Sequence, residues 1–225
     1  MSLETRWLLD VDALRPLGRA TLGRRRPRGS TVVLGSRQDH SWLDGDALRR
    51  DGVELRRRRG GGGAVLLRED DCWFEMWLPA SSAVAGDDVR ATACVVGEWW
   101  RRALGSLGVE GEVHRSGLVD GELGAIACFA GLGPGEISVG GRKMLGLSQW
   151  RSREGVLVSA IVPARPPGDL FDYLAPGAPP MPALRAAASL ELIAPSLSAD
   201  ALAASLLAVL RDAVPGLEER SGAFA

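Results

Sequence analysis

The chain contains a single lysine, Lys143, among its 27 lysine and arginine residues. An ammonium group is a compact charge on a flexible stem, and it reaches a phosphate or carbonyl oxygen differently from a planar guanidinium. The glycines of residues 140–146 surround Lys143 and allow other groups to approach the backbone closely. Either a coding preference for arginine spared one lysine by chance, or this position needs an amine for its chemistry.

Four arginines and four glycines follow one another at residues 56–63, between two apolar segments. A run of glycines is costly in backbone entropy, so it indicates a place where main-chain N–H groups must approach a ligand. The adjoining arginines offer planar forks for a carboxylate or phosphate. A Walker A loop and a dinucleotide fingerprint are excluded, because no Gly-Lys-Ser/Thr follows and the next element is a strand. The alternative is a flexible hairpin with solvated arginines.

Short strands are predicted around both segments. A buried strand at 31–34 ends in a turn at 35–38, and a second strand begins at 53–55. Residues 64–67 and 72–78 resemble the two arms of a hairpin. Further strands are expected at 112–114, 125–129, 136–139 and 156–162.

Helices are predicted mainly in the middle and at the end of the chain. Asp44 is a suitable N-cap for a helix over 44–50, and Asp51-Gly52 would stop it. Apolar spacing predicts another helix over 87–104. The remaining expectations are a helical turn at 169–174, helices at 183–192 and 198–214, a strand or short helix at 5–14, and a basic connector at 22–29 whose arginines are solvated.

Many short strands followed by terminal helices predict an α+β fold with a mixed β-sheet. We expect residues 1–180 to form the main domain and residues 181–225 a short helical C-terminal extension packed on it.

Composition excludes several classes of protein. The formal net charge of −1 gives no overall attraction to nucleic acid or to an anionic membrane. No segment has the length and apolar character of a signal peptide or a transmembrane helix. Three cysteines without CxxC spacing and two scattered histidines argue against disulfides and a metal site. We therefore expect a cytoplasmic protein.

Two blocks of sequence together resemble the lipoate–protein ligase A family. The first reads Thr-Val-Val-Leu-Gly-Ser-Arg-Gln at 31–38 and continues over 51–65 through the glycine turn. The second reads Cys-Phe at 128–129 and Glu-Ile-Ser-Val-x-Gly-Arg-Lys-Met-x-Gly-x-Ser-Gln at 136–149. The blocks appear in the order and at about the separation found in the family, which makes the joint pattern specific.

The resemblance implies a cofactor-transferase fold shared with biotin ligases, in which the glycine turn and the lysine strand face each other across an acyl pocket. It makes Lys143 the catalytic lysine, hydrogen-bonded to the acyl carbonyl and to the phosphate of an acyl-adenylate. It implies ATP and Mg²⁺ as cofactors, lipoate or octanoate as substrate, and a lipoyl-carrier domain as partner. The substrate-binding positions implied are Arg37, Gln38, Arg57, Arg58, Gly61, Gly62, Gly63, Ala64, Gly141, Gly146 and Ser148.

The chain departs from the family at two polar landmarks. The family follows its glycine turn with an aromatic residue, a histidine and an aspartate, where this chain has Leu66, Leu67 and Arg68. The His-Gly pair expected on the strand after the lysine block is also missing, since that segment reads Gly-Val-Leu-Val-Ser at 155–159. These differences put the usual nucleotide or second-substrate geometry in doubt.

Three functions therefore remain open. The first is transfer of lipoate, octanoate or a related acid to a carrier lysine through an acyl-adenylate. The second is ATP-independent octanoyl transfer from acyl carrier protein, with Cys128 as the thioester nucleophile. Cys128 as a small buried core thiol is the structural alternative. The third function is binding of an acyl chain or carrier without turnover.

Overall fold

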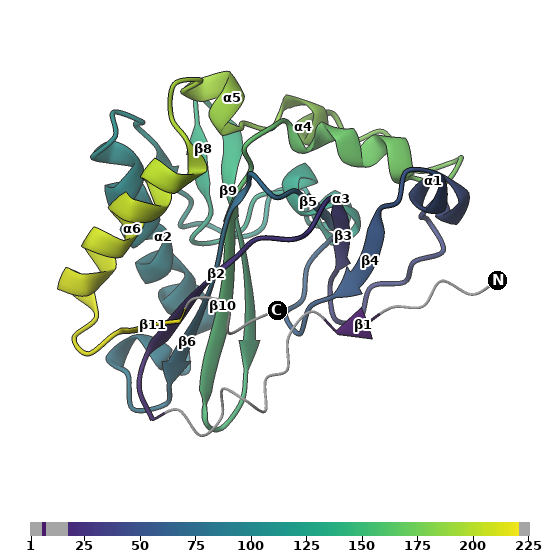
Figure 1. Ribbon diagram of the computed structural model, residues 1–225. Coiled ribbons are helices and arrows are strands. Elements are labelled where there is room, and N and C mark those ends of the chain that lie inside the picture. Colours follow the sequence, from purple (N-terminus) through teal and green to yellow (C-terminus); the bar gives the residue numbers. More distant parts are fainter. Residues whose placement is uncertain (1–5, 8–17, 221–225) are drawn as a thin grey trace.

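The computed structural model describes residues 6–7 and 18–220, which form two β-sheets with helices around them (Figure 1). The smaller sheet has the order β1 (Arg6–Trp7), β4 (Glu54–Arg57), β3 (Thr31–Leu34) and β5 (Val65–Leu67). The larger sheet has the order β11 (Glu218–Arg220), β2 (Thr21–Arg25), β6 (Cys72–Pro79), β10 (Gly155–Val162), β9 (Arg142–Arg151), β8 (Ile137–Val139) and β7 (Glu112–Val113). Both sheets contain parallel and antiparallel pairs, so the predicted α+β fold with mixed sheets is confirmed.

Six α-helices and three 3₁₀ segments are found in the described part of the chain. They are α1 (Gly45–Arg50), α2 (Val89–Gly105), α3 (Gly121–Ile126), α4 (Pro182–Ala186), α5 (Leu190–Ile193), α6 (Ala199–Ala213), η2 (Ala83–Ala85), η3 (Cys128–Ala130) and η4 (Pro167–Tyr173). None of these helices is long and apolar enough to cross a membrane.

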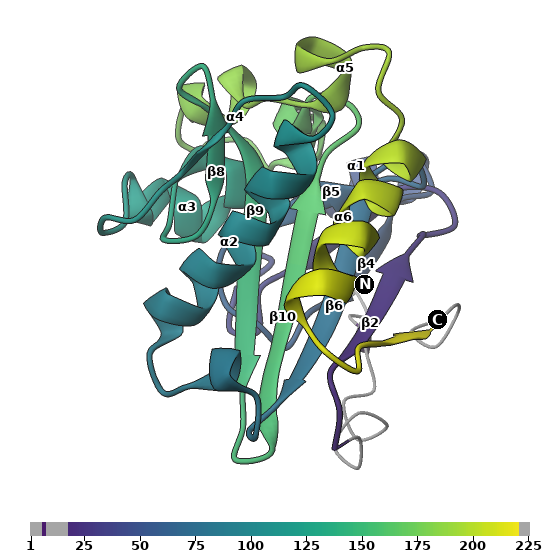
Figure 2. The same cartoon turned by 90° about the vertical axis from the view of Figure 1, so that its left-hand side faces the viewer.

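The larger sheet is covered on one face by α2 and α6, which lie side by side in Figure 2. Alternate residues of β6, Phe74 and Met76 among them, join Trp100 of α2 and Leu206 of α6 in one apolar core. The aromatic rings of Phe74 and Trp100 pack edge to face, with their centres 6.1 Å apart. The C-terminal helix therefore completes the core of the larger sheet.

The second core lies between the two sheets. Val33 of β3 and Leu67 of β5 pack there with Trp73 of β6, Phe129 of η3 and Ile161 of β10. Because this core joins both sheets, it fixes the position of the glycine turn relative to β9.

The helices predicted at 44–50 and 87–104 are found as α1 and α2, and the predicted N-cap Asp44 is confirmed. The Asp44 carboxylate accepts from the N–H groups of Asp46 and Ala47, and α1 stops at Asp51 before Gly52, whose φ is +65°. Asp88 caps α2 in the same way. The predicted turn near 169–174 is also found, as part of η4, and the helix over 198–214 corresponds to α6.

The connector predicted at 22–29 is wrong for its first half, because residues 21–25 form strand β2. Arg25 is buried, and its Nε donates to the Glu75 carboxylate at 2.8 Å while its guanidinium lies 5.6 Å from the centre of the Trp73 ring. The buried Glu75 carboxylate on β6 thus balances the charge of Arg25, which the sequence alone suggested was solvated. The element expected at 5–14 lies mostly outside the described residues.

The hairpin predicted for 64–67 and 72–78 is also wrong. β5 pairs with β3, whereas β6 pairs with β2 and β10 in the other sheet. Asp71 holds the crossing between the sheets, because its side chain accepts from the backbone N–H of Arg68 and from that of Ala164.

Two further segments differ from their predicted form. Residues 125–129 are the end of α3 and a 3₁₀ turn rather than a strand, and only Ala127 is extended, in an isolated bridge with Ala64. A short apolar run does not distinguish a strand from a buried helical segment. The helix expected at 183–192 is divided into α4 and α5, because the Ala188 N–H donates to the Lys143 carbonyl and the chain follows β9 at that point.

Candidate functional site

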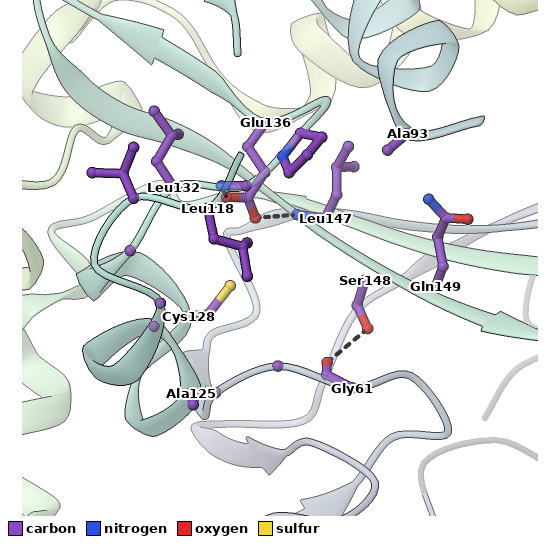
Figure 3. A pocket seen from close by; sticks show the side chains of 18 of the residues that line it. Gly61, Ala93, Leu118, Ala125, Cys128, Leu132, Glu136, Leu147, Ser148 and Gln149 are labelled. Atoms are coloured by element: carbon purple, nitrogen blue, oxygen red, sulfur yellow. Dashed lines mark hydrogen bonds between the residues drawn. The ribbon is translucent and has the colours of Figure 1, made fainter. Parts of the chain in front are cut away.

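A hollow of about 570 Å³ lies between the glycine turn, the start of α2 and strand β9 (Figure 3). Its lining is mostly apolar, with Leu118, Leu132 and Leu147 on its walls. Leu118 is 74% exposed, and Val89 at the start of α2 is 50% exposed. Large apolar side chains exposed at the mouth of an apolar hollow indicate a site for an apolar ligand.

Lys143 of β9 lies in the inner wall of this hollow and is 8% exposed. Its Nζ atom donates to the Cys128 carbonyl oxygen at 2.6 Å and to the Gly131 carbonyl oxygen at 3.0 Å. It also forms an ion pair with Glu136 Oε2 at 2.6 Å and lies 5.2 Å from the centre of the Phe129 ring. The predicted catalytic lysine is therefore buried and surrounded by acceptors.

The Glu136 side chain is the counter-charge of Lys143. Its Oε2 also accepts from the Gly133 N–H at 2.7 Å, and its Oε1 accepts from the Leu147 N–H at 3.0 Å. Burial alone would lower the pKa of Lys143, but electrostatic attraction to Cys128 and Glu136, with side-chain hydrogen bonds to both, raises that pKa above its ordinary value. Glu136 was part of the sequence block around Lys143, but nothing in the sequence showed that its carboxylate reaches the amine.

Cys128 presents its thiol to the same hollow. The sulfur Sγ lies 3.7 Å from Lys143 Nζ, and the side chain is half-buried. The Cys128 N–H donates to the Ala64 carbonyl at 2.8 Å, which ties the 3₁₀ turn to the end of the glycine turn. By contrast, Cys72 is fully buried, and burial raises the pKa of its thiol to about 12. Cys72 is thus a core residue, whereas Cys128 is accessible for chemistry.

The glycine turn borders the hollow opposite Cys128, with Gly61, Gly62 and Gly63 among the lining residues. At Gly63, a Cβ atom would collide with the backbone of Gly124 and Ala127, and at Gly60 it would collide with the Ser148 hydroxyl. At Gly61 there is open space. Two of these glycines are therefore required by close packing within the protein.

Arg58 holds the glycine turn from inside. Its side chain is buried and donates to the carbonyls of Gly61 and Gly63 through Nη2 and to that of Val33 through Nη1. Its Nε also donates to Ser148 Oγ at 3.2 Å, and Ser148 Oγ in turn donates to the Gly61 carbonyl at 3.1 Å. Both side chains line the hollow and fix the shape of the turn.

Arg57 and its neighbours in the turn at 35–38 lie behind the wall of the hollow. Arg57 Nη1 donates to the carbonyls of Gly35 and Gln38, each at 2.8 Å. Gln38 donates to the Ile126 carbonyl at 2.7 Å and accepts from the Gly35 N–H. The remaining predicted binding residue of this turn, Arg37, is exposed. In the part of the chain that the structure describes, none of these three polar side chains is among the residues lining the hollow.

The other predicted binding residues surround the site without lining the main hollow. Ala64 is buried behind the glycine turn, and Gly141 forms the turn before Lys143 with φ of +71°. Gly146 lines a smaller cavity of about 30 Å³ between the sheets, and a Cβ atom there would lie 3.1 Å from Cys128 Sγ. The two hollows share the side chains of Arg58, Cys128, Leu147 and Ser148 in their linings.

The positions where the sequence departs from the family pattern lie in the core. Leu66 and Leu67 are buried in the second apolar core, and Arg68 forms an ion pair with Asp169 at 2.5 Å. The Ser159 hydroxyl donates to Glu75 at 2.9 Å. Of these four residues, Leu67 and Ser159 border the smaller cavity. In the described part of the chain, none of the four lines the main hollow.

Solved structures of lipoate protein ligases share this fold. A lipoate protein ligase bound with ATP aligns with a TM-score of 0.75 at 18% identity, covering 97% of this chain and 88% of that one. A T. acidophilum protein described as a lipoate protein ligase, with bound lipoic acid, aligns at 0.72 with the same identity and coverage. The bi-partite lipoate protein ligase from Thermoplasma acidophilum, studied with its E2 lipoyl domain, aligns at 0.70 and 17% identity, covering 98% and 87% of the two chains.

No curated protein matches this chain in sequence. A family model, the lipoyl protein ligase A/B catalytic domain, matches residues 26–208, a range that contains the glycine turn, Cys128 and Lys143. The chain therefore belongs to the lipoyl protein ligase A/B catalytic-domain family and is a ligase- or transferase-type enzyme.

Proposed function

We propose that the protein transfers a medium-chain acyl group, octanoate or lipoate, to a lysine of a lipoyl-carrier domain, and that Cys128 carries the acyl group between donor and acceptor. The observation that supports this proposal is the 3.7 Å separation of Cys128 Sγ and Lys143 Nζ in the wall of the apolar hollow. The thiolate is the reactive form of cysteine, and the Lys143 ammonium places a positive charge beside the sulfur.

The first step is formation of a thioester on Cys128. Its thiolate attacks the carbonyl carbon of an acyl thioester on acyl carrier protein. The new C–S bond forms as the bond to the donor sulfur breaks, and the donor leaves as a thiolate that takes up a proton. The positive charge of Lys143 stabilises the negative charge that develops beside it.

The second step transfers the acyl group to the acceptor. The amine of a lysine on the carrier domain attacks the Cys128 thioester, an amide bond forms, and the Cys128 sulfur leaves. The open mouth of the hollow, beside Leu118 and Val89, gives the acceptor lysine a route to this carbon. A lipoyl domain is the partner class that we assign to the acceptor, in parallel with the E2 lipoyl domain of the structurally similar Thermoplasma acidophilum ligase.

A second candidate is transfer through an acyl-adenylate, with ATP as co-substrate. The hollow of about 570 Å³ offers room for more than an acyl chain, and the structurally similar ligase with bound ATP shares this fold. Against it, Arg57 and Arg58 already donate to backbone carbonyls. The described residues contain no cluster of three potential metal ligands, so magnesium would be held chiefly by the phosphates and water.

Mass spectrometry of a lipoyl-domain acceptor distinguishes these candidates. The enzyme is incubated with octanoyl-acyl carrier protein without ATP, and separately with octanoate or lipoate plus ATP and Mg²⁺. Acylation of the acceptor in the first arm supports the thioester route, and acylation only in the second supports the adenylate route. Acyl binding without transfer in any arm would contradict both and would identify a protein that binds without turnover.

A further inference from the structure

Protein oxygens can accept all three hydrogens of the Lys143 ammonium, and the Cys128 sulfur is a fourth, longer contact at 3.7 Å. The acceptors are the carbonyl oxygens of Cys128 and Gly131 and the carboxylate of Glu136, all within 3.0 Å of Nζ. A neutral amine has only two N–H groups and cannot donate to three acceptors at once. The site is thus built for an ammonium ion.

We propose that Glu136 is a positioning residue that holds Lys143 as a fixed cation beside Cys128, so that Lys143 does not act as a general base. This inference rests on the proposed thioester route. Glu136 is suited to the task because it is itself held at two other points, by the N–H groups of Gly133 and Leu147. The carboxylate therefore connects Lys143 to the glycine-rich segment at 131–135 and to the next part of β9.

The charges around the amine favour the same assignment. Glu136 and Cys128 both stabilise the cation, and the centre of the Phe129 ring lies 5.2 Å from Lys143 Nζ. The other charged group facing this cluster is Arg58, which interacts with both Cys128 and Glu136 but is a permanent cation. With two cations and two potential anions, the cluster is close to neutral when Cys128 is a thiolate.

A fixed cation determines where the protons move. Lys143 cannot accept the proton of the attacking acceptor amine, because it already carries its full complement. When the amide bond forms, the C–S bond to Cys128 breaks, and the departing sulfur takes up the proton of the amine. The thiol is then restored, and it must lose that proton before the next cycle.

The single lysine makes this inference directly measurable. Labelling the full-length protein with ¹³Cε-lysine gives one lysine signal, whose chemical shift during a pH titration reports the pKa of Lys143. The variants are Glu136→Gln and Glu136→Asp, with Glu98→Gln as a matched control. Glu98 is a half-buried carboxylate on α2 that is paired with Arg101 and Arg115, away from the hollow.

Glu136→Gln should lower the pKa of Lys143 by about one unit or more, because a buried cation loses its counter-charge. The value of kcat for acyl transfer should fall about tenfold or more while KM for the acyl donor changes little, the pattern of a lost transition-state interaction. Glu136→Asp should recover part of both effects, and Glu98→Gln should alter neither.

An unchanged lysine titration in folded Glu136→Gln protein would overturn the proposal, as would full activity in that variant. A wild-type Lys143 that titrates near neutral pH would also overturn it, since the lysine would then be available as a base. If Glu136→Gln does not fold, the wild-type titration and the Glu136→Asp variant still decide between these outcomes.

Discussion

The amine of Lys143 contacts both Cys128 and Glu136 in the wall of the hollow. It lies 2.6 Å from the Glu136 carboxylate and 3.7 Å from the Cys128 sulfur, and both Lys143 and Glu136 are buried. Electrostatic interactions are strong in such a setting, because little solvent screens them. The thiol and the amine therefore function as one unit.

Replacing Cys128 by serine should abolish acyl transfer from a carrier thioester. A serine hydroxyl at this site has no adjacent base and stays protonated near neutral pH, so we expect a loss of about 100-fold or more in kcat/KM. The melting temperature should change little, because the substitution is small and half-buried. Cys94→Ser on α2, away from the hollow, is the matched control and should retain activity in the same mass-spectrometric assay.

Replacing Lys143 by methionine should destabilise the protein as well as inactivate it. The Glu136 carboxylate would remain buried without its partner, at a cost of about 3–5 kcal/mol in the free energy of unfolding. The double variant Lys143→Met with Glu136→Gln should recover much of this stability but no activity. Urea unfolding measures the first effect, and equal stability of the single and double variants would contradict the account.

At the scale of elements, the glycine turn both packs against the end of α3 and forms part of the wall of the hollow. Gly63 packs against the backbone at the end of α3, whereas Gly61 faces open space in the hollow. The close backbone approach at Gly63 joins the turn to the segment that carries Cys128. The turn thus sets the distance across the hollow.

Two alanine substitutions in this turn should separate these two roles. Gly63→Ala should reduce the free energy of unfolding by about 1–3 kcal/mol, because the new methyl group meets backbone atoms that cannot move freely. Gly61→Ala should leave thermal stability nearly unchanged and should raise KM for the acyl donor, because its methyl group enters the hollow. Thermal unfolding and steady-state kinetics of the two variants measure these effects. If ligand contact alone explained the glycines, Gly63→Ala would leave the thermal stability unchanged and would raise KM at least as much as Gly61→Ala.

The sequence predicts elements well where a local signal is sufficient. Asp44 and Asp88 cap their helices through contacts within a few residues, and the two halves of the site were expected to meet because their motifs occur together. The turn at 68–71 could not be recognised as a crossing between sheets, because Asp71 receives one of its hydrogen bonds from distant Ala164. The inward orientation of Arg57 and the contact of Glu136 with Lys143 are likewise tertiary.

At the scale of the whole molecule, the site depends on the position of the smaller sheet relative to the larger sheet. The glycine turn follows β4 of the smaller sheet, and Lys143 belongs to β9 of the larger sheet. The core around Trp73 and Phe129 fills the space between them, and Asp71 holds the crossing. A change that loosens this junction should therefore affect the hollow.

Asp71 should make stability depend on pH in an unusual direction. Burial raises its pKa from 3.8 to about 6, even though two backbone N–H groups donate to it. Above pH 6 the carboxylate is ionised in both states and the folded state bears the cost of burying the charge. Between about pH 6 and pH 4 the folded state binds the proton first, so the free energy of unfolding should gain up to about 3 kcal/mol from this group.

The variant Asp71→Asn isolates this contribution, because asparagine does not titrate. Urea unfolding of both proteins between pH 4 and pH 7 should show the wild type gaining stability relative to the variant as the pH falls. Curves that stay parallel over this range would show that Asp71 is ionised throughout in the folded protein.

The central claim, that Cys128 carries the acyl group, is tested most directly by trapping the intermediate. The protein is mixed with octanoyl-acyl carrier protein in the absence of ATP and acceptor, quenched in acid, and digested for peptide mass spectrometry. We predict one octanoyl group on the Cys128 peptide, removed by hydroxylamine and lost when a lipoyl domain is added before the quench. An unmodified Cys128 peptide from enzyme that acylates the lipoyl domain under the same conditions would contradict the account.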